Sequence, residues 1–175
     1  MSNHNPYTTP VSDVVDISNN EGIAKIKSFK RFSTWWVVLL AMFTLGIYAY
    51  YWMVSRTNTI NSIIPENKVS MWIPYTIIIS GVINLIATML PIALPFIDTI
   101  SEEATANFMA FGQIATLLSF VGLILTLIWV YKFRNRLNLI SGSKKGDVYR
   151  VGPILTFFFQ LYYMQYKINQ MHDAT

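Results

Sequence analysis

The stretch VSMWIPYTIIISGVINLIATMLPIALPFI (residues 69–97) contains no charged residue, and ATANFMAFGQIATLLSFVGLILTLIWVY (residues 104–131) is equally uncharged. A helix needs about 20 apolar residues, at roughly 1.5 Å rise per residue, to cross about 30 Å of hydrocarbon. Each stretch meets that requirement. We expect one span near residues 71–90, because Pro91 and Pro95 discourage continuation, and a second near residues 108–131.

Two further apolar segments flank this pair. Residues 35–54, WWVVLLAMFTLGIYAYYWMV, carry no charge but are interrupted by Gly46. Residues 151–166, VGPILTFFFQLYYMQY, open with a Gly-Pro helix start and are too short for a straight span. We therefore predict an all-α integral membrane protein with four apolar helical segments, in which the middle two form a spanning hairpin and the outer two are spanning or re-entrant.

The composition of the 175-residue chain agrees with this class, since 53% of the residues are hydrophobic and only 13% are charged. It excludes a disordered chain, a coiled coil and a disulfide scaffold. Residues 1–22 are polar and are expected to form a disordered tail without a cleavable signal peptide, followed by a single membrane domain at residues 23–171. In residues 23–32, apolar side chains three apart alternate with Lys and Arg, which favours an amphipathic helix among headgroups or an ordinary basic flank of a span.

Charge sets the expected topology. The loop at residues 91–107 carries Asp98, Glu102 and Glu103 without Lys or Arg, whereas residues 132–150 carry six basic side chains. Because cytoplasmic loops are enriched in Lys and Arg, loop 91–107 is predicted outside and loop 132–150 in the cytoplasm. The basic residues before residue 35 disfavour translocation of that end and so favour re-entrant outer segments. The aromatic residues at both ends of residues 35–54 favour a span instead.

Small polar residues form a stripe on each predicted spanning helix. They occur at helical spacing, with no Asp, Glu, Lys, Arg or His in either stripe. Close packing of the two helices, with hydrogen bonds between them, is the favoured interpretation, and a polar pathway for a solute is the alternative. The helix-packing candidates are Ser80, Gly81, Asn84 and Thr88 in the first stripe and Gly112, Gln113, Thr116 and Ser119 in the second.

A short motif after the first apolar run carries a resemblance to a known family. Residues 44–52 read T-L-G-I-Y-A-Y-Y-W, and Gln165, Lys167 and Asn169 lie in Y-Y-M-Q-Y-K-I-N. With these motifs the chain resembles a bacterial family of small integral membrane domains of unknown function, the unknown-function family numbered four-two-three-four, over about residues 30–170. The resemblance implies a membrane domain and no particular activity. The start N-P-Y-x-x-P at residues 5–10 is similar to that of many Gram-negative inner-membrane proteins, which implies the bacterial cytoplasmic (inner) membrane.

The aromatic residues of this motif have two interpretations. Gly46 allows a bend or a close approach of another helix. Rings of the amphipathic kind are typical of belts at the membrane interface, and an aromatic pocket for a lipid or a quinone is the alternative. The candidates are Tyr48, Tyr51 and Trp52, with the later pair Tyr162 and Tyr163.

The sequence favours binding over catalysis. We expect a non-enzymatic scaffold or a module whose partners are membrane lipids, other membrane proteins or a second copy of itself, with no cofactor, no metal and no nucleic acid. A lipid or small-solute carrier or channel is the alternative, and it requires Asn84 and Gln113 to face an open cavity rather than each other. A membrane enzyme would need a carboxylate or histidine at the interface, and the candidates are Glu66, Asp98, Glu102, Glu103 and Asp147.

Overall fold

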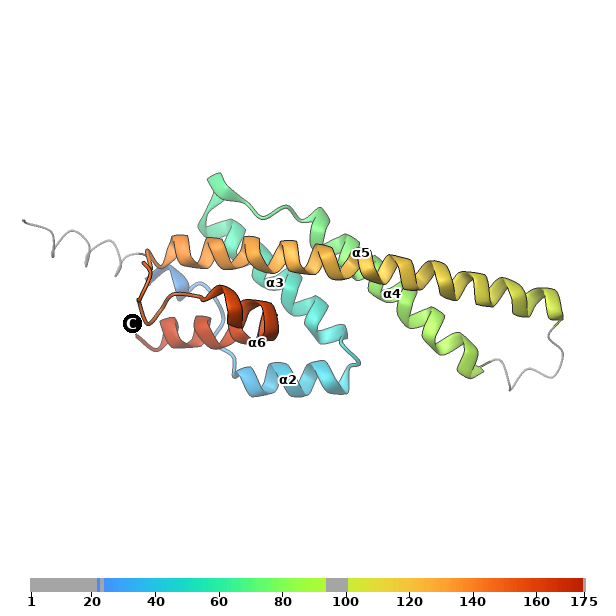
Figure 1. Ribbon diagram of the computed structural model, residues 1–175. Helices are drawn as coiled ribbons and strands as arrows, with labels where there is room; N and C mark the ends of the chain where they lie inside the picture. Colours follow the sequence, from blue (N-terminus) through green and yellow to red (C-terminus); the bar gives the residue numbers. More distant parts are fainter. Residues whose placement is uncertain (1–21, 23, 94–100, 175) are drawn as a thin grey trace, which may run out of the picture.

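The computed structural model describes residues 22, 24–93 and 101–174. Its helical elements are α2 (Thr34–Phe43), α3 (Ile47–Ile63), the 3₁₀ helix η1 (Pro65–Asn67), α4 (Trp72–Ala93), α5 (Glu102–Ile140) and α6 (Pro153–His172). Helix α5 runs the length of the molecule, α4 packs along its N-terminal half, and α3 and α6 pack against its C-terminal half (Figure 1). The all-α prediction is confirmed for the described residues.

Helices α4 and α5 form the predicted hairpin. Both are long and apolar enough to cross a membrane, with mean hydropathies of 1.9 for α4 and 2.3 for α5 over the most apolar 18 residues of each helix. Helix α5 begins earlier than the predicted span because Ser101 caps it, accepting a hydrogen bond from the backbone N–H of Ala104 at 3.2 Å. Glu102 and Glu103 in its first turn stabilise the helix, because their negative charges lie near the positive end of the helix dipole.

The expected end of α4 at residue 90 is wrong by part of a turn. The helix includes Pro91 and continues to Ala93. A proline removes one backbone N–H and crowds the carbonyl four residues earlier, but in a last turn few hydrogen bonds remain to be lost. Residues 94–100, with Asp98 and Pro95, lie outside the described part of the chain.

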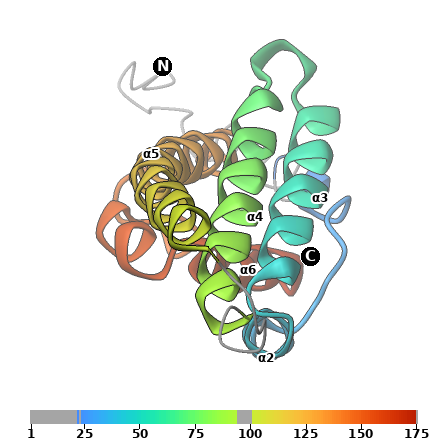
Figure 2. The ribbon, with the colours of Figure 1, turned by 90° about the vertical axis from the view of Figure 1, so that its right-hand side faces the viewer.

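Helix α5 is longer than a membrane requires. Its 39 residues correspond to about 58 Å, against roughly 30 Å of hydrocarbon. Its buried residues also concentrate at the C-terminal end, where α3 and α6 cover it (Figures 1 and 2). The helix therefore contributes to two parts of the fold, an apolar hairpin with α4 that is long enough to span a membrane and a compact helical cap. Buried residues in the capped part are Trp129, Val130, Phe133, Leu137 and Ile140.

An aromatic cluster of Phe29, Trp52, Trp129 and Phe133 forms the centre of the cap. Trp129 stacks on Phe133 with ring centroids 5.3 Å apart, and Trp52 meets both rings at 6.0–6.3 Å. Phe29 contacts Phe133 edge-on at 6.4 Å. The indole of Trp129 also donates to the hydroxyl of Thr57 at 2.9 Å, so the cluster is packed and hydrogen-bonded at once.

Both outer apolar segments are broken in the middle. Residues 35–54 divide into α2 and α3 at a turn over residues 44–46, where Gly46 has φ 90° and Leu45 has φ 51°. Residues 151–166 fall in α6, which is interrupted at Gln160 (φ 38°, ψ −117°). In the described chain only α4 and α5 meet the length and apolarity of a span.

The basic segment before α2 packs into the protein. A helical turn at residues 24–26 is followed by a bend, and Ile26 and Phe29 are fully buried in the core of the cap. Their lysine neighbours Lys25 and Lys27 stay exposed. Ile26 and Phe29 of the predicted apolar face thus contact the cap, and Ile23 lies outside the described residues. Of the predicted tail, residues 1–21 lie outside the described residues, and Gly22 is buried.

Asparagine side chains fix the two connections into α4 and α6. Asn61 donates to the carbonyl of Val69 at 2.8 Å and accepts from its N–H at 2.7 Å. Asn138 holds Val151 in the same two-bond manner, at 3.2 and 2.8 Å. Basic side chains of α5 assist, since Arg134 donates to the carbonyl of Val151 and Arg136 to that of Asn67. These arginines of the predicted cytoplasmic flank therefore bond to the protein's own backbone.

Candidate functional site

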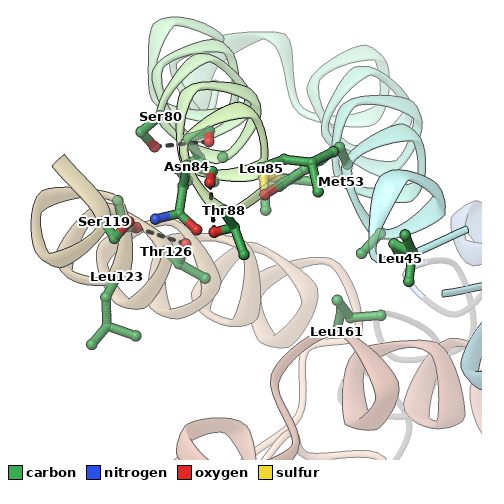
Figure 3. A pocket seen from close by; sticks show the side chains of 15 residues that line it. Leu45, Met53, Ser80, Asn84, Leu85, Thr88, Ser119, Leu123, Thr126 and Leu161 are labelled. Atoms are coloured by element: carbon green, nitrogen blue, oxygen red, sulfur yellow. Dashed lines mark hydrogen bonds between the residues drawn. The ribbon is translucent and has the colours of Figure 1, made fainter. Parts of the chain in front are cut away.

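A cavity of about 550 Å³ lies between α3, α4 and α5; we call it the hairpin cavity. Of its fifteen lining residues seven are aliphatic, two are glycine and six are polar, with Leu161 contributed by α6 (Figure 3). Its polar lining comes from hydroxyls and one amide, and no charged side chain of the described residues lines it. These polar residues are Tyr50, Ser80, Asn84, Thr88, Ser119 and Thr126.

The serine and threonine hydroxyls of the cavity bond within their own helices. Ser80 donates to the carbonyl of Ile77, and the other three donate to the carbonyl four residues earlier, all at 2.8–2.9 Å. The structure thus places these hydrogen bonds inside the helices rather than between them. The amide of Asn84 makes no hydrogen bond within the described residues, and it lies in the cavity beside Thr88 and Thr126 (Figure 3).

Two glycines allow close approaches around the cavity. A Cβ atom added to Gly122 on α5 would lie 2.7 Å from the hydroxyl of Ser80 on α4. A Cβ atom added to Gly81 on α4 would collide with the hydroxyl of Tyr50 on α3. At both positions the end of a neighbouring side chain would have to move to admit a methyl group.

The two predicted stripes contribute unequally to the lining of the cavity. Five of the packing candidates line it, namely Ser80, Gly81, Asn84, Thr88 and Ser119. On α5, Gln113 and Thr116 are exposed, and a Cβ at Gly112 would meet nothing within 4 Å. Asn84 and Gln113 therefore do not face each other, and only Asn84 faces the cavity.

The motif at residues 44–52 builds the turn between α2 and α3. The Thr44 hydroxyl donates to the carbonyl of Leu40 at 2.6 Å and accepts from the N–H of Tyr48 at 2.9 Å. It thereby supplies an acceptor for an N–H in the first turn of α3, while the carbonyl of Leu40 also accepts from the N–H of Thr44 at 3.0 Å. Gly46 adopts the left-handed conformation that reverses the chain.

The candidate aromatic residues do not form one belt. Tyr51 is exposed and stacks near Tyr48, with ring centroids 5.8 Å apart, while Trp52 is buried in the aromatic cluster. Tyr162 and Tyr163 lie on α6 and pack against the core of the cap. The Tyr163 hydroxyl accepts from the N–H of Gly152 at 3.1 Å, which helps to position the start of α6.

A buried polar network joins the motif to α6; we call it the Gln165 network. The Gln165 oxygen accepts from the indole of Trp52 at 2.8 Å and from the guanidinium of Arg56 at 3.0 Å. Its amide nitrogen donates to the carbonyl of Phe32 at 2.9 Å and to Asn169 at 2.8 Å. Gln165 is fully buried, so all its hydrogen-bonding capacity is used inside the protein. The network ties α3, α6 and the segment before α2 together.

Arg56 is a buried cation with neutral partners. It is 6% exposed, and its Nη2 donates to Gln165 and, at 2.7 Å, to the carbonyl of Lys30. The rings of Phe29 and Trp52 lie 5.9 Å from its guanidinium carbon, within range of a cation–π interaction. Burial lowers the pKa of Arg56 from its ordinary value, because the charged form loses hydration. Within the described residues the single ion pair is Arg31–Asp173, so no carboxylate compensates Arg56 there.

A second, smaller pocket of about 220 Å³ lies beside Arg56 and α2; we call it the Arg56 pocket. It combines two cationic side chains with three hydroxyl-bearing ones. Its lining residues are Lys30, Phe32, Leu40, Tyr48, Tyr51, Trp52, Ser55 and Arg56. The Arg56 pocket and the hairpin cavity share no lining residue.

The carboxylates considered for catalysis lie far apart. Glu66 is in η1, which contacts the C-terminal part of α5 through Arg136, whereas Glu102 and Glu103 begin the same helix about 50 Å away. Asp147 accepts from the N–H of Lys144 in its own turn. Among the described residues no group of three His, Cys, Asp or Glu side chains is placed to hold a metal ion.

Comparison with known families decides what the chain belongs to. The model of a family described as "Domain of unknown function (DUF4234)" matches residues 32–139. The chain is a member of this family. In this DUF4234 protein the match includes the turn motif, Arg56 and the hairpin, and it ends before α6. The match thus covers less of the chain than the expected resemblance over residues 30–170. Comparisons with curated proteins and with solved structures gave no match.

Sequence reasoning missed Arg56, Asn61, Thr57 and Asn138 of the DUF4234 protein. Arg56 lies one turn after Trp52, so a cation placed directly after an uncharged aromatic run was the available signal. Its partner Gln165 is 109 residues away, and no local pattern relates the two. The asparagines that fix Val69 and Val151 bond across loops, which sequence spacing alone does not reveal.

Proposed function

We propose that the protein is a non-enzymatic membrane module that binds lipid in the hairpin cavity. The observation that carries this proposal is the cavity itself. Its volume of about 550 Å³ falls within the roughly 300–1,000 Å³ of small-molecule sites. Aliphatic side chains, together with serine and threonine hydroxyls that are already bonded within their own helices, suit an acyl chain or a glycerol backbone better than an ion.

The exposed apolar surface supports a lipid environment around this cavity. In each of α4 and α5, only 22% of the most apolar 18 residues are buried inside the protein. Trp35 and Phe43 of α2 are 77% and 83% exposed, and Phe158 of α6 is 71% exposed. Exposure of such apolar surfaces to water is unfavourable. Acyl chains, another membrane protein or a second copy of the chain would cover them. The scaffold role belongs to the same proposal.

The proposed location is the bacterial cytoplasmic membrane, with loop 91–107 outside and loop 132–150 in the cytoplasm. The supporting observation is that the cap lies at the basic end of α5. Because the sequence has no cysteine, single cysteines can test this in intact cells. We expect Ala106→Cys to label from outside, and Ser28→Cys and Val148→Cys to label only after permeabilisation. Labelling of Ser28→Cys in intact cells would contradict the proposed side of the cap.

Lipid binding is testable with a photoactivatable diacylglycerol in nanodiscs. We expect crosslinks in the cavity-lining peptides of α3, α4 and α5. Ala49→Phe places a ring in the cavity and should reduce these crosslinks severalfold. Ala110→Phe is the matched control, because Ala110 is exposed on α5 and does not line the cavity. Equal crosslinking of the two variants would refute the proposal.

A carrier is the second candidate, favoured by one observation. The amide of Asn84 faces the cavity without a hydrogen-bond partner among the described residues, so it is free to bind a polar solute or headgroup. Gln113 does not share that position. A carrier predicts movement of fluorescent lipid or solute across proteoliposomes that Asn84→Leu abolishes. Binding without movement would leave the lipid-binding module as the function.

A further inference from the structure

We propose that the Arg56 pocket binds a phosphate-bearing anion, either as a lipid headgroup or as free phosphate. The site goes beyond the proposed lipid-binding cavity, with which it shares no residue. Its basis is an unusual set of groups in one pocket of about 220 Å³. Two cations and three hydroxyls line it, and no carboxylate of the described residues does. They are Lys30, Arg56, Tyr48, Tyr51 and Ser55.

Arg56 supplies the first argument, because its hydrogen-bonding capacity is only partly used. Nη2 has two acceptors inside the protein, the carbonyl of Lys30 and the side chain of Gln165. Nε and Nη1 have none among the described residues, yet no fully enclosed side-chain nitrogen of the described chain lacks a partner. These two nitrogens are therefore not fully enclosed, although Arg56 as a whole is only 6% exposed. Arg56 lines the pocket, which offers space for an acceptor beside its guanidinium.

The charge of the guanidinium makes the missing partner an anion. Nε and Nη1 lie on different edges of the planar group, so each can donate a separate charge-assisted hydrogen bond to an oxyanion. A buried cation bonded only to neutral acceptors also keeps a large unmet electrostatic demand. An oxyanion in the pocket would satisfy both requirements at once.

The other lining groups complete a donor set. The side chains of Lys30, Tyr48, Tyr51 and Ser55 make no hydrogen bond or ion pair within the described residues. Each carries a donor, so the pocket offers several donors to one ligand. Phosphate presents more acceptor oxygens than a carboxylate, and this number of donors favours it.

The neighbourhood of the pocket favours a phospholipid as the source. Leu40 of α2 lines the pocket, and the same helix exposes Trp35, Trp36 and Phe43. An acyl chain can lie along this apolar helix while its phosphate enters the pocket. The pocket is also smaller than the roughly 300–1,000 Å³ of drug-sized sites, which suits a headgroup phosphate.

The test compares phosphatidic acid with diacylglycerol of the same acyl chains. Binding to the full-length protein in detergent is measured by native mass spectrometry. We expect the protein to retain phosphatidic acid with at least tenfold higher affinity than diacylglycerol at this site. Lys30→Gln should reduce that preference about tenfold, and Tyr48→Phe should reduce it several fold.

Lys25→Gln is the matched control, because Lys25 is exposed in the same basic segment and does not line the pocket. It should change the preference by less than twofold. If Lys25→Gln and Lys30→Gln have equal effects, the attraction is general surface charge and the proposal fails. Neither substitution removes the backbone carbonyl of Lys30 that Arg56 uses.

Inorganic phosphate distinguishes the two sources. Competition by millimolar phosphate, with direct stabilisation of the protein by phosphate alone, identifies a free-phosphate site. Binding of phosphatidic acid that phosphate does not displace identifies a headgroup site. If the parent protein shows no preference for phosphatidic acid but still binds diacylglycerol, the Arg56 pocket is refuted and the hairpin cavity stands. If the parent protein prefers phosphatidic acid but does not bind diacylglycerol, the hairpin cavity is refuted and the Arg56 pocket stands.

Discussion

Replacement of Gln165 by leucine is the most direct test of the cap's organisation. The substitution keeps nearly the same volume but removes four hydrogen bonds from a fully buried position. The indole N–H of Trp52 is then left without an acceptor in the core. The carbonyl of Phe32 keeps a partner, since Asn169 also donates to it at 2.8 Å.

The expected cost follows from these individual losses. A buried donor left without a partner costs about 1–3 kcal/mol, which applies to the indole of Trp52. Arg56 loses a charge-assisted bond of about 1.5–3 kcal/mol but keeps the carbonyl of Lys30. The leucine regains about 1 kcal/mol through burial of additional apolar surface. We therefore expect Gln165→Leu to lower the free energy of unfolding by about 3 kcal/mol.

Equilibrium unfolding in mixed micelles, followed by tryptophan fluorescence, measures this loss. Trp52 and Trp129 report on the cap because both lie in the aromatic cluster. Gln113→Leu is the matched control, since Gln113 is exposed and makes no hydrogen bond within the described residues. It should change stability by no more than about 0.5 kcal/mol. Equal effects of the two substitutions would refute the structural role assigned to the network.

Three further predictions concern the hairpin and the chain ends. Gly122→Ala should destabilise the hairpin by about 0.5–1.5 kcal/mol, because the new methyl group displaces the Ser80 hydroxyl from its hydrogen bond to Ile77, and Ser80→Gly should restore part of that loss in a double-mutant cycle. Asn84→Leu should leave stability in detergent within about 1 kcal/mol of the parent, since its amide has no partner within the described chain; a larger loss would show an unrecognised packing role. The hydrogen bond from Arg31 lowers the pKa of the Asp173 carboxyl below its ordinary value of 3.8. The Arg31–Asp173 pair therefore stabilises the fold fully above pH 3.8, and this stabilisation is lost as the pH falls through the lowered pKa. Asp173→Asn should remove this acid-limb dependence in a pH titration of thermal stability, and an unchanged acid limb would exclude the pair as its source.

The hairpin was predictable because a bilayer imposes a simple rule on sequence. A long uncharged helix is required to cross hydrocarbon, and both uncharged stretches form such helices. The predicted ends were less accurate, because the Ser101 cap and the glutamates after it extend α5 beyond the predicted span. Hydropathy does not predict a polar helical extension of this kind.

The cap was less predictable because its core contains the same residue types that are typical of a membrane interface. Trp52 and Trp129 occur in aromatic, uncharged runs that are typical of interfacial belts, yet both are buried against Phe133. What distinguishes a core indole from a belt indole is its hydrogen-bond partner. Those partners, Gln165 and Thr57, lie 113 and 72 residues away in sequence.

The two broken segments and the Gln165 network together favour one arrangement of the outer helices. The network fixes the polar halves, α3 and the second half of α6, inside the cap. The apolar halves, α2 and residues 153–159, are thereby held beside the same end of the hairpin. Ten residues of α2 extend about 15 Å, half of the roughly 30 Å of hydrocarbon. We therefore propose that both apolar halves enter the membrane from the side of the cap and return without crossing, which keeps the basic residues near both of them on that side.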